Sequence, residues 1–89
     1  MTRKELEANY KRYQNSSMYS LYDAYGRPSQ KKYDAWKRCE VFCKECGGES
    51  LKVISYNTYV FTAGFVFVKD GKRMFMLITP STNREIEVE

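Results

Sequence analysis

Residues 50–79, SLKVISYNTYVFTAGFVFVKDGKRMFMLIT, decide the fold of this chain. Two mainly apolar segments, 59–68 and 73–79, flank Asp70-Gly71, a dipeptide that is typical of a two-residue β-hairpin turn. The stretch therefore predicts an antiparallel hairpin whose register follows by counting outward from the turn. The predicted pairs are Phe67 with Met74, Phe65 with Met76, and Ala63 with Ile78.

A third strand is predicted immediately upstream of this hairpin. Residues 51–56 reach the segment 59–68 through Asn57-Thr58, and this short connection predicts that Ile54 pairs with Phe61. The expected product is a three-stranded antiparallel meander with residues 59–68 in the middle.

The central segment is apolar on both faces, although an antiparallel sheet usually leaves one face to water. One face is expected to carry Ile54, Tyr56, Phe61, Phe65, Phe67, Met74, Met76 and Ile78. The other is expected to carry Leu51, Val53, Val60, Val66, Val68, Phe75 and Leu77, with Gly64 leaving room for a helix. The main helix is expected to cover one face and residues 3–25 the other, and the sequence does not indicate which face each of them takes. A face left uncovered would be a homodimer or partner surface.

Short helices are predicted near the N-terminus. Thr2 and Glu5 form a capping-box pattern, which typically opens a helix. A helical stripe follows, made by Leu6, Tyr10 and Tyr13. Residues 18–25 resume helical spacing, so two short helices are expected within residues 1–26.

The main helix is predicted over residues 28–47, from a proline in its first turn to a Gly-Gly pair at its end. One side of it carries a core-facing stripe of Ala35, Trp36, Cys39, Phe42, Cys43 and Cys46. Residues 84–88 alternate apolar and acidic side chains and predict a short fourth strand.

We therefore expect one α+β domain over residues 1–89. Its N-terminal helices, within residues 1–26, precede a long helix at 28–47 that packs on an antiparallel sheet of three or four strands at 50–89. A chain of 89 residues has room for one modest core. No apolar segment approaches the length of a membrane span, and the N-terminus lacks the apolar region of a signal peptide. Three cysteines, an odd number, argue against a disulfide framework, so a reducing cytoplasm is the expected location.

The residue types present do not favour catalysis. Histidine is absent, and no phosphate-binding glycine loop occurs. We expect no enzymatic activity, no catalytic residues and no cofactor. The spacing Cys39-x3-Cys43-x2-Cys46 is interpreted as a row of small buried side chains, with zinc binding as the alternative that would require a further ligand.

The charge distribution indicates an acidic partner. The net charge is +4, and residues 1–46 hold ten Lys or Arg against six Asp or Glu, whereas residues 47–89 hold five of each. Six of the eight tyrosines also lie in the basic half. Basic residues interleaved with aromatic ones are typical of surfaces that bind nucleic acid or acidic proteins. The predicted binding residues are Lys11, Arg12, Tyr22, Tyr25, Arg27, Lys31 and Lys32.

Four sequence motifs point to a family. They are YGRPS at 25–29, AW at 35–36, LKVI at 51–54 and FTAGF at 61–65. Together they resemble small orphan proteins that are encoded by bacteriophages and prophages of Gram-positive bacteria. The resemblance implies a protein that acts in the cytoplasm of a bacterial host cell. It also implies that the protein binds and disables a host protein assembly, such as an RNA-guided nuclease, as anti-CRISPR proteins do.

The leading hypothesis is therefore a non-catalytic, phage-type binding protein that inhibits a host protein, such as an RNA-guided or other defence nuclease or its nucleoprotein complex. The alternative is a small basic accessory protein that binds DNA or RNA through the same residues. A third hypothesis is an interaction module that is stapled by zinc through the cysteines.

Overall fold

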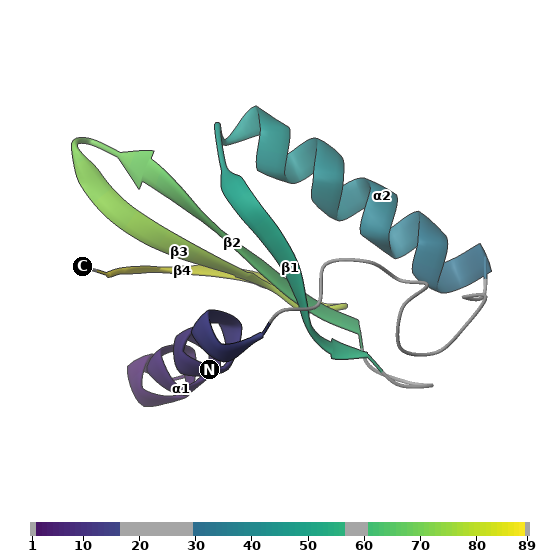
Figure 1. Ribbon diagram of the computed structural model, residues 1–89, viewed down its shortest axis with the longest axis horizontal. Coiled ribbons are helices and arrows are strands. Elements are labelled where there is room, and N and C mark those ends of the chain that lie inside the picture. Colours follow the sequence, from purple (N-terminus) through teal and green to yellow (C-terminus); the bar gives the residue numbers. More distant parts are fainter. Residues whose placement is uncertain (1, 17–29, 57–60, 89) are drawn as a thin grey trace.

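A computed structural model describes residues 2–16, 30–56 and 61–88, with the backbone alone for residues 31, 32 and 56. The described chain is an α+β domain, as predicted (Figure 1). Its elements are α1 (Arg3–Asn15), α2 (Gln30–Glu45), β1 (Glu49–Tyr56), β2 (Phe61–Lys69), β3 (Lys72–Ile78) and β4 (Asn83–Glu87). The strands form one antiparallel sheet in the order β1-β2-β3-β4, so the predicted fourth strand is confirmed.

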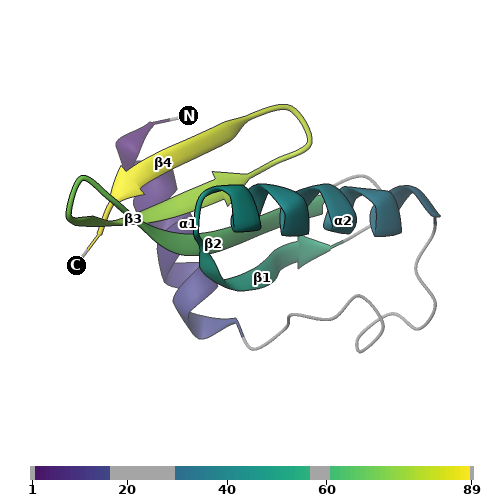
Figure 2. The ribbon, with the colours of Figure 1, turned by 90° about the horizontal axis from the view of Figure 1, so that it is seen from above.

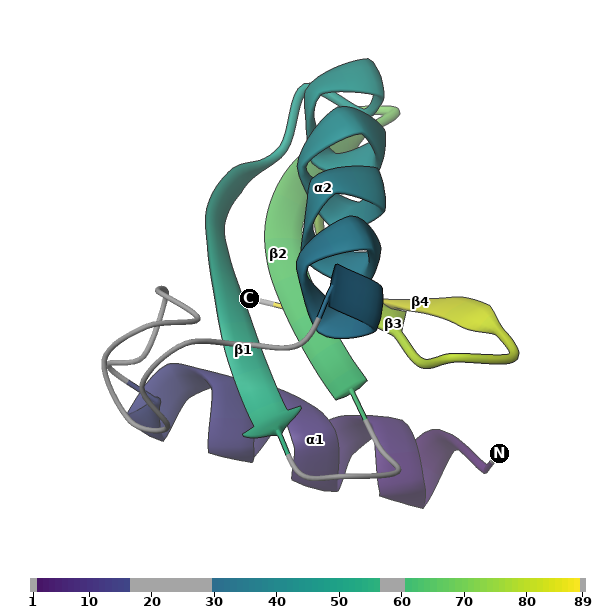
Figure 3. The same cartoon turned by 90° about the vertical axis from the view of Figure 1, so that its right-hand side faces the viewer.

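The domain has three layers, with the sheet between the two helices (Figures 2 and 3). The first helix, α1, crosses the strands and contacts β1, β3 and β4, while α2 runs alongside β1 and β2 on the opposite face. Because both faces are covered by the chain itself, the apolar character of the central strand is explained without a second copy. The expectation that the N-terminal region covers the second face is confirmed for α1.

The expected contrast between short N-terminal helices and one long helix is not confirmed. Both helices are short, with 13 residues in α1 and 16 in α2. Residues 18–25, where a second N-terminal helix was expected, lie outside the described residues. Neither described helix combines the length and the apolar character that crossing a membrane would require.

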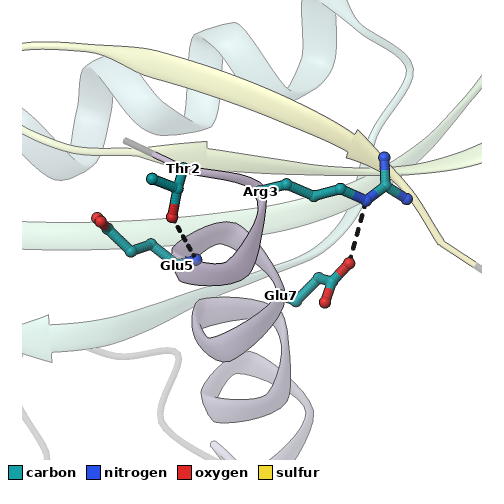
Figure 4. Close-up of polar contacts among 4 residues, drawn as sticks. All are labelled: Thr2, Arg3, Glu5 and Glu7. Atoms are coloured by element: carbon teal, nitrogen blue, oxygen red, sulfur yellow. Dashed lines mark hydrogen bonds and ion pairs between the residues drawn. The ribbon is translucent and has the colours of Figure 1, made fainter.

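The start of α1 follows the predicted capping pattern. The Thr2 hydroxyl accepts a hydrogen bond of 3.2 Å from the backbone N–H of Glu5, and this satisfies one of the free donors of the first turn (Figure 4). Next to the cap, Arg3 forms an ion pair of 3.1 Å with Glu7, which lies one turn further along the exposed side of the helix. The cap therefore fixes where α1 begins.

The β2–β3 hairpin has the predicted register. Phe67 pairs with Met74, Phe65 with Met76, and Ala63 with Ile78. At the turn, Asp70 and Gly71 have φ angles of 53° and 76°. Positive φ at both central residues is what a type I′ turn requires, and its twist matches that of the strands it joins.

The predicted register of β1 was wrong. Val53 pairs with Ala63 and Tyr56 with Phe61, so Ile54 does not pair with Phe61. The pairing shifts twice along β1, between Glu49 and Lys52 and again between Val53 and Ser55. A shift of one residue moves every side chain of a strand to the other face.

Two local features account for the error in β1. At its far end Tyr56 pairs with Phe61, whereas a two-residue turn at Asn57-Thr58 would pair Tyr56 with residue 59. Ser50, beside the first shift, has a φ of 56°, a conformation common at β-bulges but rare for residues other than glycine. As a result, Ile54 joins the α1 side of the core, whereas Val53 and Leu51 join the α2 side.

The core has one part under each helix. The part between α1 and the sheet contains Leu6, Tyr13, Val66, Phe75, Leu77 and Ile86. The whole predicted stripe of α2 packs against the other face. The part between α2 and the sheet contains Cys39, Cys43, Val53, Phe61, Ala63, Phe65, Phe67 and Met76. Each face of β2 therefore has its own core.

Gly64 makes room for an aromatic ring, where we had expected it to make room for a helix. A Cβ atom at Gly64 would lie 2.6 Å from Cε1 of Phe75 and 3.1 Å from Cδ1 of Ile54. The Phe75 ring in turn contacts Tyr10 and Tyr13, with ring centroids 5.1 and 5.0 Å away. The absence of a side chain at Gly64 thus sets the depth at which the α1 aromatic residues pack.

We predict that Gly64→Ala destabilises the domain by about 1–3 kcal/mol, because the added methyl group overpacks against Phe75. Chemical denaturation measures the change. In the background of Phe75→Leu, which removes the ring, the same alanine should cost less than half as much. An equal cost in both backgrounds would contradict the assigned role of Phe75.

Candidate functional site

The residues predicted to form one binding surface lie in three parts of the chain. Lys11 and Arg12 are exposed on α1. Lys31 and Lys32 lie in the first turn of α2, of which the structure describes only the backbone at these positions. The remaining three, Tyr22, Tyr25 and Arg27, lie outside the described residues. Because α1 and α2 cover opposite faces of the sheet, the basic pair of α1 and the basic pair of α2 are not on the same side of the sheet.

The outward side of α1 is polar and basic. Leu6, Tyr10 and Tyr13 pack against the sheet, so the residues on the opposite side of the helix face solvent. This outward stripe consists of Lys4, Ala8, Lys11, Arg12 and Asn15, all of them exposed. Acidic residues flank it, since Glu5 precedes Arg12 by seven residues and lies on the same side of the helix, whereas Glu7 is paired with Arg3.

Three cationic residues of the sheet share the side of the molecule that α1 covers. The Lys52 ammonium lies 4.8 Å from the centre of the Tyr13 ring and 3.5 Å from the Tyr13 carbonyl oxygen. Arg73 shares the face of Phe75, and Arg84 that of Ile86, because alternate residues of a strand share a face. We call the set Lys4, Lys11, Arg12, Lys52, Arg73 and Arg84 the α1 face.

The two sides of the described domain differ in charge. The α1 side carries seven basic residues, namely Arg3 and the six residues of the α1 face. Three acidic residues lie on the same side, Glu5, Glu7 and Glu49. On the α2 side, the described side chains comprise five basic and five acidic residues, and α2 also carries Lys31 and Lys32, of which only the backbone is described. The basic ones are Lys37, Arg38, Lys44, Lys69 and Lys72, and the acidic ones are Asp34, Glu40, Glu45, Glu85 and Glu87.

The pattern of ion pairs sharpens this difference. Three pairs lie on the α2 side, Lys37 with Glu40 at 3.5 Å, Lys69 with Glu85 at 3.1 Å and Lys72 with Glu87 at 3.8 Å. Within the described part of the chain, the residues of the α1 face form no ion pair. Exposed ammonium and guanidinium groups without acidic partners bind phosphate or carboxylate groups readily.

A polar junction fastens α1 to the edge strand β1. The buried Tyr13 hydroxyl donates a hydrogen bond of 2.7 Å to the Ser50 carbonyl, and the Ser16 hydroxyl donates one of 3.0 Å to the Val53 carbonyl. Burial raises the pKa of the Tyr13 hydroxyl, which keeps it protonated as a donor. The junction thus places the C-terminal half of α1, with Lys11 and Arg12, beside Lys52.

The cysteines are free thiols on the inner side of α2. Cys39 and Cys43 are buried, and Cys46 is half-buried. Burial raises the pKa of all three thiols, and that of Cys39 rises from 9.0 to about 11. In the described part of the chain, no three Cys, Asp or Glu side chains form a group that could hold a metal ion. Protonated, buried thiols are poor nucleophiles and poor metal ligands.

Sequence reasoning missed four of the six residues of the α1 face. Lys4 could have been found, because it precedes Lys11 by seven residues and therefore lies on the same side of a helix. The other three, Lys52, Arg73 and Arg84, lie on separate strands. Only the strand register and the position of α1 bring them to one side.

Comparisons with known proteins identify no relative. No family model matches the chain, no curated protein matches it, and no solved structure matches it. The resemblance to orphan proteins of bacteriophages therefore stays a prediction.

We predict that Tyr13→Phe lowers the free energy of unfolding by about 1–2 kcal/mol, because the buried Ser50 carbonyl loses its donor. Tyr10→Phe is the matched control, because the Tyr10 hydroxyl makes no hydrogen bond to the described residues. The Tyr10 ring packs against the same aromatic rings as that of Tyr13. Denaturant titration compares the two variants. Equal effects would show that the hydroxyl of Tyr13 does not fasten α1.

We predict that a thiol reagent labels Cys46 first in the native protein and labels Cys39 and Cys43 only slowly, as their burial requires. Mass spectrometry after limited alkylation measures the order. Fast labelling of all three thiols in the native protein would contradict the packing of α2.

We also predict a dependence of stability on pH that arises from Cys39. Its pKa is higher in the folded chain, so its contribution to stability is complete below about pH 9 and is lost as the pH rises towards about 11. Denaturation at several pH values measures this loss, and Cys39→Ala should show a smaller one. The same pH dependence in both proteins would remove Cys39 as its source.

Proposed function

We propose that this chain is a non-catalytic binding protein that attaches to an acidic macromolecular surface through its α1 face. The observation that supports this most is the unequal charge of the two sides. The cations of the α1 face form no ion pair among the described residues, while three cations of the α2 side, Lys37, Lys69 and Lys72, are paired with glutamates. A surface of this kind steers an anionic partner towards one side of the protein.

The resemblance to orphan proteins of bacteriophages suggests where the partner is found. Small phage proteins of this type bind and disable host machines, so the proposed target is a host protein, such as an RNA-guided or other defence nuclease or its nucleoprotein complex. Inhibition would then follow from occupying a surface that the target needs, and it would require no catalytic residue. The protein would act in the cytoplasm of the host.

Nucleic acid is the second candidate for the partner, because its phosphates offer the same anionic chemistry as an acidic protein surface. The basic outward stripe of α1 favours it. The zinc-stapled module has no such support among the described residues.

We predict that the double variant Lys11→Glu with Arg12→Glu loses at least about tenfold of its affinity for the host target, since like charges would then face each other. Lys37→Glu with Arg38→Glu is the matched control, because it reverses an adjacent Lys-Arg pair on the other helix. Each protein is immobilised and exposed to bacterial lysate, and the captured partner is identified by mass spectrometry.

The control variant should capture as much partner as the wild type. Equal capture by both double variants, with both folded, would show that the α1 face is not the binding surface. Circular dichroism confirms folding, and both substitutions change exposed residues, so little loss of stability is expected.

A further inference from the structure

The outward stripe of α1 has the dimensions and residue types of a helix that enters a DNA groove. A helix of 13 residues is about 20 Å long, and the major groove of B-form DNA, about 12 Å wide, admits an α-helix. Ala8 lies in the middle of the stripe and leaves space for close approach. Lys4, Lys11 and Asn15 surround it with side chains that bind phosphates and base edges.

Among the described residues, the α1 side offers few features of a typical protein interface. Such interfaces depend on a few aromatic or large apolar side chains that fill pockets of the partner. The large hydrophobic residues that are exposed in the described chain are Val41, on the other helix, and Val68, which lies on the α1 side because it shares a face of β2 with Val66 and pairs with Arg73. One exposed valine does not supply such an interface. Recognition through this side must therefore depend mainly on charge and hydrogen bonds.

Single-stranded nucleic acid also fits this side poorly. Proteins that bind single strands stack the bases on exposed aromatic rings. On the α1 side, Tyr10, Tyr13 and Phe75 pack on one another, with ring centroids 5.0 to 6.1 Å apart, and Phe75 is fully buried. Double-stranded RNA is disfavoured for a different reason, since its major groove is too deep and narrow for a helix.

Further cations lie where the phosphates of a duplex would pass. Lys52 sits over the Tyr13 ring, and the charge of Arg73 acts on the Tyr13 hydroxyl, so both flank the C-terminal half of α1. Arg84 lies on β4, one of the strands that α1 crosses. These cations could contact the backbones on the two sides of the groove while the helix occupies it.

From this geometry we propose that the α1 face binds double-stranded B-form DNA, with the outward stripe of α1 in the major groove. This inference rests on the proposed function, because it names the acidic surface that the α1 face takes. The partner would be the DNA on which a host nuclease or other host machine acts.

Fluorescence anisotropy of the full chain with a labelled DNA duplex of about 20 base pairs, two helical turns, tests the proposal. The competitors are an RNA duplex and a DNA single strand of the same sequence, and polyglutamate as a protein-like polyanion. The DNA duplex should bind at least about tenfold more tightly than each of the others, as a groove-dependent contact requires.

The salt dependence tests the residues. If about five phosphates are contacted, log K should fall against log salt concentration with a slope of about −4 to −5. Lys11→Gln with Arg12→Gln should reduce that slope by about 2, as the loss of two phosphate contacts predicts. Lys37→Gln with Arg38→Gln should leave it unchanged.

Equal affinity for the duplex, the single strand and polyglutamate would overturn the inference, and so would an equal loss of slope in both variants. A protein partner that survives nuclease treatment and is lost with K11E/R12E, without any DNA binding, would overturn the inference but leave the proposed function standing. If the wild-type chain neither binds DNA nor captures a partner through α1, both the inference and the proposed function are overturned.

Discussion

The structure depends on a sheet that is apolar on both faces. Strand β2 is buried from Phe61 to Phe67, so water must be excluded from both of its sides. One helix on each face achieves this, and the three-layer arrangement follows. The hydrophobic effect therefore sets the architecture, while the type I′ turn at Asp70 and Gly71 sets the alignment of the two inner strands.

Placing the helices on opposite faces also separates the charges. Lys37 of α2, and Lys69 and Lys72 at the adjoining strand ends, form ion pairs with glutamates. Exposed pairs of this kind add little to stability, but they neutralise part of the charge of the α2 side. The cations of the α1 face form no ion pair among the described residues, and the proposed binding surface therefore lies on the side of α1. The polar junction between Tyr13 and Ser50 holds α1 in the position that gathers them.

Much of the fold could be predicted because its determinants are local. Four of them depend on residues that are close together in the chain. These are the Asp-Gly turn, the apolar runs of β2 and β3, the apolar stripe of α2 and the cap of α1. The register of β1 could not be predicted, because it depends on the positive φ of Ser50 and on two shifts of the pairing along β1 that no turn residue indicates. The Tyr13 hydrogen bond to Ser50 spans 37 positions in the sequence, and no local pattern indicates it.

The candidate site shows the same division. The sequence by itself determined the class of fold, the excess of basic residues in the N-terminal half and the basic character of Lys11 and Arg12, because composition and short-range periodicity carry that information. Only the tertiary structure decided that Lys52, Arg73 and Arg84 lie on the side of α1, whereas α2, which carries Lys31 and Lys32, lies across the sheet. The reason is physical: the face on which a strand residue lies depends on register, and the side on which a helix packs depends on which apolar surface it buries.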